Sequence, residues 1–258
     1  MIRLRKLIIV FILSVNGLFA QVTVELLTNA TEGNAAGSAD GVLNTYFHDY
    51  KNQALYLAPD LFLASITSGS SISEIGIKVF QRPAGNNAAK THIVNFRIAF
   101  ATTSSTTLST LATTTVVYGP IDFLNTDFTA GQWKMFTLDT PIVWNGTDNL
   151  IIEFSTDGDD FESGGGVYNR QVSNRSMHGQ SDSNHGAYPF SSMIGPLLTH
   201  VPSLKFTHNG PGIVLDPIGG ITTTEAGGTG TFNVKLNSAP TADVTIGLSS
   251  SDDTEGIP

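Results

Sequence analysis

The sequence predicts an all-β protein, and three observations support this fold class. Apolar and polar residues alternate along several segments; in residues 94–100, Val94, Phe96 and Ile98 share one face, the pattern of a half-buried strand. Clusters of Gly, Asn and Pro separate these segments, as at Asn145-Gly146, and are typical of turns. After the N-terminus, no segment shows the apolar spacing of an amphipathic helix. Many short strands without helices are typical of a β-sandwich, and we expect a jelly-roll-like topology.

The strands expected in the first part of the chain fall at residues 75–79, 92–100, 133–138 and 150–154. Residues 150–154 carry apolar side chains on both faces, which predicts a more fully buried strand. Two polar segments interrupt the pattern. Residues 102–115 read as an exposed loop or a weak edge strand, and residues 173–192 read as a long loop, either a binding loop or a disordered one.

The N-terminus has the layout of a secretory signal peptide. Arg3, Arg5 and Lys6 precede the apolar run at residues 7–13, and a short segment at residues 16–20 follows, ending with the small residue Ala20. We expect cleavage after Ala20 and export of the mature chain, either secreted or held at the cell surface. The apolar run is shorter than the roughly 20 residues that a spanning helix requires, and we expect no transmembrane segment elsewhere.

The absence of Cys and the negative net charge exclude several kinds of site and partner. The chain has no Cys, which excludes disulfides and thiolate metal sites. Removal of residues 1–20 takes away three of the 13 basic residues and none of the 22 acidic ones, so the net charge of the mature chain is 10 − 22 = −12. Such a surface repels phosphate backbones, and we expect no nucleic-acid partner.

The mature chain divides near residue 208. Residues 21–207 are expected to form the β-sandwich, with a binding or accessory role, and residues 208–212, which are rich in Gly and Pro, form a linker. In the second unit, residues 213–258, two segments have alternating apolar residues. These segments, 232–236 and 244–248, predict an antiparallel hairpin, preceded by an edge segment that begins at Ile213.

This second unit resembles the N-terminal half of a Calx-β module in its bacterial tandem-repeat form. The resemblance rests on Thr224-Glu225-Ala226-Gly227-Gly228 and on residues 231–236, 237–246 and 248–256. It implies a truncated immunoglobulin-like sandwich and further modules of the same polypeptide beyond Pro258. Glu225, Asp252 and Asp253 stand where the family has acidic calcium ligands. Calcium takes 6–8 oxygens, so these three residues are either part of a calcium site or solvated loop acids.

A second acidic segment follows the buried strand at residues 150–154. It concentrates four carboxylates, Asp157, Asp159, Asp160 and Glu162. Carboxylates this close together favour either solvent or a hard cation such as calcium. The segment therefore predicts a calcium-binding loop or an acidic turn that keeps the strand end soluble.

Trp144, with Tyr168 and Tyr188, is a candidate for stacking against a sugar ring; packing of Trp144 in the core is the alternative. Residues 138–154 also resemble part of a non-catalytic β-sandwich module that occurs in large secreted bacterial surface proteins. That resemblance implies binding or adhesion and identifies no ligand.

The sequence carries no motif for catalysis: it has no His-Glu-x-x-His, no Gly-x-Ser-x-Gly and no Gly-Lys phosphate loop. We therefore expect a non-catalytic adhesion or binding protein, a fragment of a larger multi-module protein with calcium-stabilised Calx-β-like repeats. Its partner would be an extracellular glycan or a surface protein. The alternative is a carbohydrate-binding accessory region of a larger secreted hydrolase.

Overall fold

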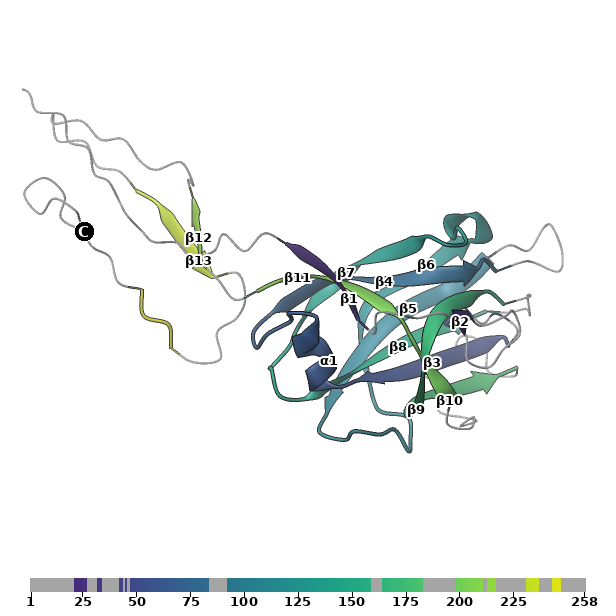
Figure 1. Cartoon of the computed structure of the whole chain (residues 1–258). Helices are drawn as coiled ribbons and strands as arrows, with labels where there is room; N and C mark the ends of the chain where they lie inside the picture. Colours follow the sequence, from purple (N-terminus) through teal and green to yellow (C-terminus); the bar gives the residue numbers. More distant parts are fainter. Residues whose placement is uncertain are drawn as a thin grey trace, which may run out of the picture.

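The fold is built almost entirely from antiparallel strands, which confirms the all-β class (Figure 1). The computed structural model describes residues 21–26, 32–33, 42–43, 45, 47–83, 92–158, 164–182, 198–210, 213–216, 231–236 and 243–246. The predicted signal peptide, residues 1–20, lies outside them. None of the helices in the described ranges is long and apolar enough to cross a membrane.

Eleven of the strands form one sheet in the order β1-β11-β4-β9-β3-β8-β5-β6, with β7 on β4 and both β2 and β10 on β9. The bounds of these strands are β1 Val22–Leu26, β2 Glu32–Gly33, β3 Asp49–Tyr56, β4 Ser71–Gln81, β5 His92–Thr103, β6 Thr115–Leu124, β7 Trp133–Val143, β8 Asn149–Asp157, β9 Gly166–Ser181, β10 Leu198–Pro202 and β11 Leu204–Asn209.

The sheet curls where β4 changes partners. Strand β11 pairs with β4 from Ser71 to Ile77, and β9 pairs with it from Val79 to Gln81. The curl divides the sheet into a smaller half, made of β1, β11, β4 and β7, and a larger half, made of β9, β3, β8, β5 and β6 with β2 and β10 on β9. Successive side chains of a strand point to opposite faces, so along each strand they alternate between the space enclosed by the two halves and the outside.

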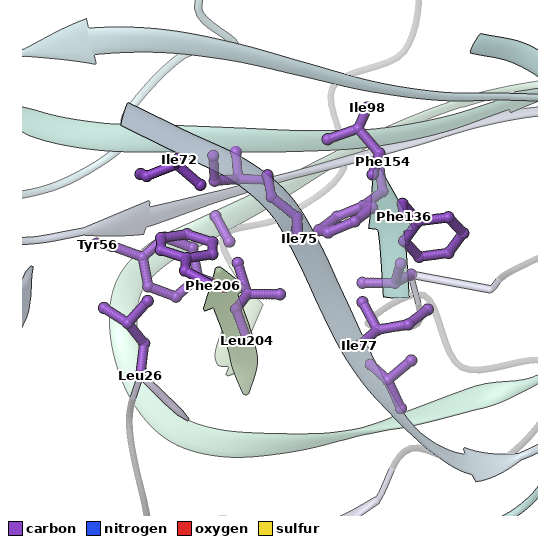
Figure 2. Packing of buried hydrophobic residues seen from close by; sticks show 14 of the residues in the cluster. Leu26, Tyr56, Ile72, Ile75, Ile77, Ile98, Phe136, Phe154, Leu204 and Phe206 are labelled. Carbon is purple, nitrogen blue, oxygen red and sulfur yellow. The ribbon is translucent and has the colours of Figure 1, made fainter. Parts of the chain in front are cut away.

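The two halves enclose one hydrophobic core (Figure 2). Ile75, Ile77 and Phe136 face it from the smaller half, and Ile98 and Phe154 face it from the larger half. The ring of Phe136 stacks on Phe96 with centroids 5.0 Å apart. Because these positions follow the period of two in the sequence, the predicted strands and the observed core agree.

The larger half is buried on its outer face as well. Every residue of β3 and of β8 is buried, as the apolar run at residues 150–154 predicts. The connection from β5 to β6, residues 104–114, covers this face and packs Leu108 against Leu55, Ile151 and Met177. The expected loop is therefore present, but its Leu108 is buried and anchors it to the sheet.

Two local expectations were wrong. Residues 173–181 belong to β9 instead of a loop, because their polar side chains meet polar partners on β3; the Asn52 amide donates to the Ser176 hydroxyl at 3.2 Å. The chain also contains short helices, α1 (Ala58–Leu63) and the 3-10 turn η1 (Asn125–Asp127). Pro59 lies in the first turn of α1, and the Asp60 carboxylate accepts the Leu57 N–H at 3.1 Å, which starts a helix too short to show a helical repeat.

The C-terminal part contains a separate two-stranded sheet. Strand β12 (Ile213–Asp216) pairs antiparallel with β13 (Asn233–Leu236), and neither pairs with the eleven-stranded sheet. The predicted strand at residues 232–236 is thus present, but the predicted hairpin with residues 244–248 was wrong, since residues 243–246 form no strand. The aliphatic run Ile213-Val214-Leu215 supplies the competing partner.

Candidate functional site

The outer face of the smaller half, together with the start of β9 where it pairs with β4, carries a group of aromatic and lysine side chains. We call this group the aromatic strip; it consists of Lys78 and Phe80 on β4, Trp133 on β7, Tyr168 on β9 and Lys205 on β11. Lys78, Phe80, Tyr168 and Lys205 are each one residue away from a core position, such as Ile77, Val79 or Leu204, and Trp133 lies three residues before the core residue Phe136. Since successive side chains of a strand point to opposite faces, the strip lies on the face turned away from the core.

Two cation–π contacts and one ring contact join the side chains of the strip into two groups, Lys205 with Trp133 and Lys78 with Tyr168 and Phe80. The Lys205 ammonium lies 4.6 Å from the centroid of the Trp133 ring, and the Lys78 ammonium lies 4.9 Å from that of Tyr168. Phe80 meets Tyr168 edge to face, with centroids 5.5 Å apart and planes at 87°. Each contact of this kind contributes about 0.5–1.5 kcal/mol, enough to favour one arrangement of the rings.

Gly76 lies at the centre of this face, and no side chain projects from the sheet there. It lies between Lys205 and Met135 in the same row of the sheet. A methyl group at position 76 would overlap the Met135 sulfur and would lie 3.3 Å from the Lys205 Cβ. The absence of a side chain here lets Lys205 reach across β4 to Trp133 on the far strand.

The strip is accessible and has polar groups with no protein partner. Phe80 is 40 % exposed, and Trp133 and Tyr168 are half-buried. Within the described part of the chain, the Trp133 indole N–H and the Tyr168 hydroxyl make no hydrogen bond to protein, and Lys78 pairs with no carboxylate. Lys205 pairs with Glu25 at 3.3 Å.

This combination suits a ligand that is apolar on its faces and polar at its edges. A sugar ring presents C–H groups that pack on an aromatic face and hydroxyls that bond to nearby N–H and O–H groups. Tyr and Trp provide both functions at once, an apolar ring and a polar tip. A strand face suits an extended ligand better than a small enclosed one.

The structure separates the residues predicted for sugar stacking. Tyr168 belongs to the strip, whereas Tyr188 lies outside the described residues. Trp144 is 0 % exposed and part of the core. Its indole N–H donates to the Asp148 carbonyl at 2.7 Å, and its ring meets Phe62 edge to face at 5.0 Å. Trp144 therefore presents no face to a ligand, and the stacking role predicted for it was wrong.

Trp133 was overlooked in the sequence, although a signal was present. In the predicted strand at residues 133–138, Phe136 and Leu138 are the core positions. Strand alternation then places Trp133 on the opposite face. Trp133 is informative because it joins other rings on this outer face, and a patch of large apolar side chains needs an explanation that a single one does not.

The predicted calcium ligands remain predictions. Asp157 is buried at the end of β8, opposite Asp49 in the ladder, and its Oδ2 lies 4.0 Å from the Arg97 guanidinium. The other predicted ligands, Asp159, Asp160, Glu162, Glu225, Asp252 and Asp253, lie outside the described residues. In the ranges that are described, no group of three or more acidic or histidine side chains is arranged to hold a metal ion.

A second polar cluster lies under the 104–114 connection and has a structural role. The buried Gln53 side chain bonds twice to the backbone of Ala112, donating to its carbonyl at 2.8 Å and accepting from its N–H at 2.7 Å. It also donates to Glu153 at 2.6 Å, and the Thr114 hydroxyl donates to the same carboxylate oxygen at 3.1 Å. These bonds fix the connection on the outer face of the larger half.

Shifted pKa values occur away from the strip. Burial, and then the nearby Asp60, raise the pKa of Tyr56, whose hydroxyl donates to the Pro202 carbonyl at 2.7 Å. Burial, and then Asp139, raise the pKa of Tyr118. Burial lowers the pKa of His208. These shifts accompany packing.

Comparisons of the chain with protein-family models, with curated proteins and with solved structures find no match.

Proposed function

We propose that this chain is an exported, non-catalytic binding protein whose larger domain holds an extracellular glycan on the aromatic strip. The observation that carries the proposal is the arrangement of Phe80, Trp133 and Tyr168. These partly exposed rings share one strand face, and the indole N–H and phenol hydroxyl have no protein partner among the described residues. Such rings give stacking surfaces, and their polar tips give hydrogen bonds to sugar hydroxyls.

The chemistry of the strip favours binding over catalysis. Its five side chains comprise three aromatic rings and two ammonium groups, with no carboxylate or imidazole. Acid–base catalysis of glycoside cleavage uses a pair of carboxyl groups beside the ligand. A surface of rings and ammonium groups supplies affinity and orientation instead.

Export and assembly into a larger protein complete the proposal. The N-terminal layout of residues 1–20 supports a cleaved signal peptide and a secreted or surface-held protein. The resemblance of residues 213–258 to half of a Calx-β module supports further modules beyond Pro258, with calcium stabilising them. Adhesion is the role we favour; a binding region of a larger secreted hydrolase uses the same strip.

The experiment is a comparison of Trp133→Ala with Leu63→Ala in the mature chain. Leu63 is 87 % exposed on α1, away from the strip, so its truncation controls for loss of an exposed apolar side chain. We expect Trp133→Ala to weaken retention on immobilised polysaccharides about tenfold, which corresponds to ~1.4 kcal/mol, with an unchanged circular dichroism spectrum. Leu63→Ala should bind like the wild type. No binding to any polysaccharide on a broad array, or equal binding by Trp133→Ala, would refute the proposal.

The calcium component has its own test. Anything that binds only the folded state raises the melting temperature in proportion to the logarithm of its concentration. We expect excess calcium to raise the melting temperature of a chain that continues beyond Pro258, and a chelator to reverse the effect. An unchanged melting temperature in that longer chain would show that the modules are stable without calcium.

A further inference from the structure

The lysines of the aromatic strip occupy the ring faces that a sugar would use. Lys205 lies over Trp133 at 4.6 Å, and Lys78 lies over Tyr168 at 4.9 Å. A neutral sugar that stacks on either ring must displace an ammonium group and lose a contact of about 0.5–1 kcal/mol. The strip is thus poorly suited to a neutral ligand.

An anionic sugar removes this cost. When the ligand takes the ring face, the displaced ammonium can pair with a carboxylate or sulfate on the same ligand. A charge-assisted hydrogen bond is roughly twice as strong as a neutral one. A displaced ammonium group therefore gains free energy when it pairs with an anion of the ligand, whereas it gains none when it is left in water.

The charges around the strip support this reading. In the described residues Lys78 has no carboxylate partner, and Lys205 has only Glu25, at 3.3 Å. Glu25 is 46 % exposed, so its pair with Lys205 is a weak surface pair that a ligand anion can replace. By contrast, Arg175, outside the strip, is paired with Asp60 at 2.7 Å. Among the described residues, the strip thus holds one lysine without a carboxylate partner, Lys78, and one weakly paired lysine, Lys205, in an acidic protein.

The dimensions of the strip indicate a polymer. From Gly76 to Phe80 along β4 the strand rises roughly 13 Å, at about 3.3 Å per residue. The strip also crosses from β11 over β4 to β7. One sugar ring covers one aromatic ring, so a ligand that reaches both Trp133 and Tyr168 has several sugar units.

The rest of this face favours a glycan over an acidic protein. Beside the strip, the same outer rows of the sheet carry Thr23, Thr207, Glu74 and Thr137. The Thr137 hydroxyl donates to the Glu74 carboxylate at 3.0 Å. Protein interfaces use a continuous apolar centre, which these polar rows interrupt.

Building on the proposed glycan-binding function, we infer that the strip binds an acidic polysaccharide, through uronate carboxylates or sulfate esters that pair with Lys78 and Lys205. The anionic groups pair with the two ammonium groups while neighbouring sugar rings pack on Trp133 and Tyr168. Lys78 and Lys205 then determine specificity, and the aromatic rings determine orientation.

The test uses polymers matched in backbone and different in charge. Carboxymethylcellulose and hydroxyethylcellulose share a β-1,4-glucan backbone, and dextran sulfate and dextran share another. We expect the mature chain to bind the charged member of at least one pair about tenfold more tightly in affinity electrophoresis. The double variant Lys78→Gln/Lys205→Gln should lose this preference and keep its weak binding to the neutral member.

Lys134→Gln is the matched control. Lys134 also lies over aromatic rings, 4.7 Å from Phe123 and 5.6 Å from Phe128, but on the other face of β7, so its loss should leave the preference unchanged. Equal binding of charged and neutral members would overturn the acidic-ligand inference and leave the glycan proposal intact. If Trp133→Ala still bound the charged polymers as tightly as the wild type, the binding would be general electrostatic attraction, and the acidic-ligand inference would be overturned. Binding of poly-glutamate with no polysaccharide bound would overturn both proposals in favour of an acidic protein partner.

Discussion

Replacement of Gln53 by Leu tests whether the 104–114 connection is held by a few buried hydrogen bonds. Gln53 is 0 % exposed and makes three side-chain hydrogen bonds, two to the Ala112 backbone at 2.8 and 2.7 Å and one to Glu153 at 2.6 Å. Leu has a similar volume and can make none of them. The Ala112 N–H and carbonyl would lose their partner, and the Glu153 carboxylate would lose one of its hydrogen bonds.

The expected cost follows from the three bonds. Each neutral bond contributes about 1 kcal/mol, and a bond to a charged group contributes about 1.5–3 kcal/mol, so Gln53→Leu should lower the free energy of unfolding by about 3–5 kcal/mol. This is a large part of the stability of an ordinary domain, about 5–15 kcal/mol. With a urea dependence of about 2–3 kcal/mol/M, the unfolding midpoint should fall by roughly 1–2 M.

The assay is urea unfolding of the mature chain, combined with hydrogen exchange at the Ala112 amide. Gln171 is an exposed glutamine on β9, and Gln171→Leu makes the same chemical change without burial; we expect it to stay within about 0.5 kcal/mol of the wild type. The Ala112 amide should lose its protection in Gln53→Leu only. A loss of less than about 1 kcal/mol, with an unchanged urea dependence, would show that packing of Leu108 holds the connection without these bonds.

Three further outcomes are expected from stability measurements. Trp144→Ala should cost about 3–5 kcal/mol in chemical denaturation, because it opens a cavity in the core and removes a buried hydrogen bond. In thermal denaturation, Gly146→Ala should be more destabilising than Gly131→Ala. Both glycines have positive φ, +81° and +80°, but a methyl group at 146 would overlap Ser68 while one at 131 has open space. Burial lowers the pKa of His208 from 6.5, so the unfolded state binds a proton at a higher pH than the folded state does. The stability that neutral His208 contributes is therefore complete above about pH 6.5 and falls as the pH drops below that value. His208→Gln should remove that part of the pH dependence.

Strand positions were predictable because burial leaves a period of two in the sequence. The alternation of Ile75, Ile77 and Val79, and the unbroken apolar run Leu150-Ile151-Ile152, correspond to half-buried β4 and fully buried β8. Both patterns result from local geometry, since the side chains of one strand alternate whatever its partners are.

Features that depend on distant partners were not predictable in the same way. The polar residues of β9 read as a loop until Ser176 is placed beside Asn52, more than a hundred residues away. Strand β13 takes β12 as its partner instead of the nearer segment at residues 244–248. In both cases the local sequence allows two arrangements, and a contact distant in sequence decides between them.

The location of the candidate site depends on which outer face of the curled sheet is left open. On the larger half, Leu108 and the Gln53 hydrogen bonds hold the 104–114 connection over the sheet, and β3 and β8 have no exposed residue. On the smaller half, no described segment covers Trp133 or Phe80. Sequence reasoning chose Trp144, which lies beside a turn, and the fold places that ring in the core. Trp133 begins a strand in the opposite phase to Phe136, so the same alternation that buries Phe136 turns Trp133 outward. A tryptophan's phase relative to the core residues of its own strand is therefore a better guide to ligand contact than its proximity to a turn.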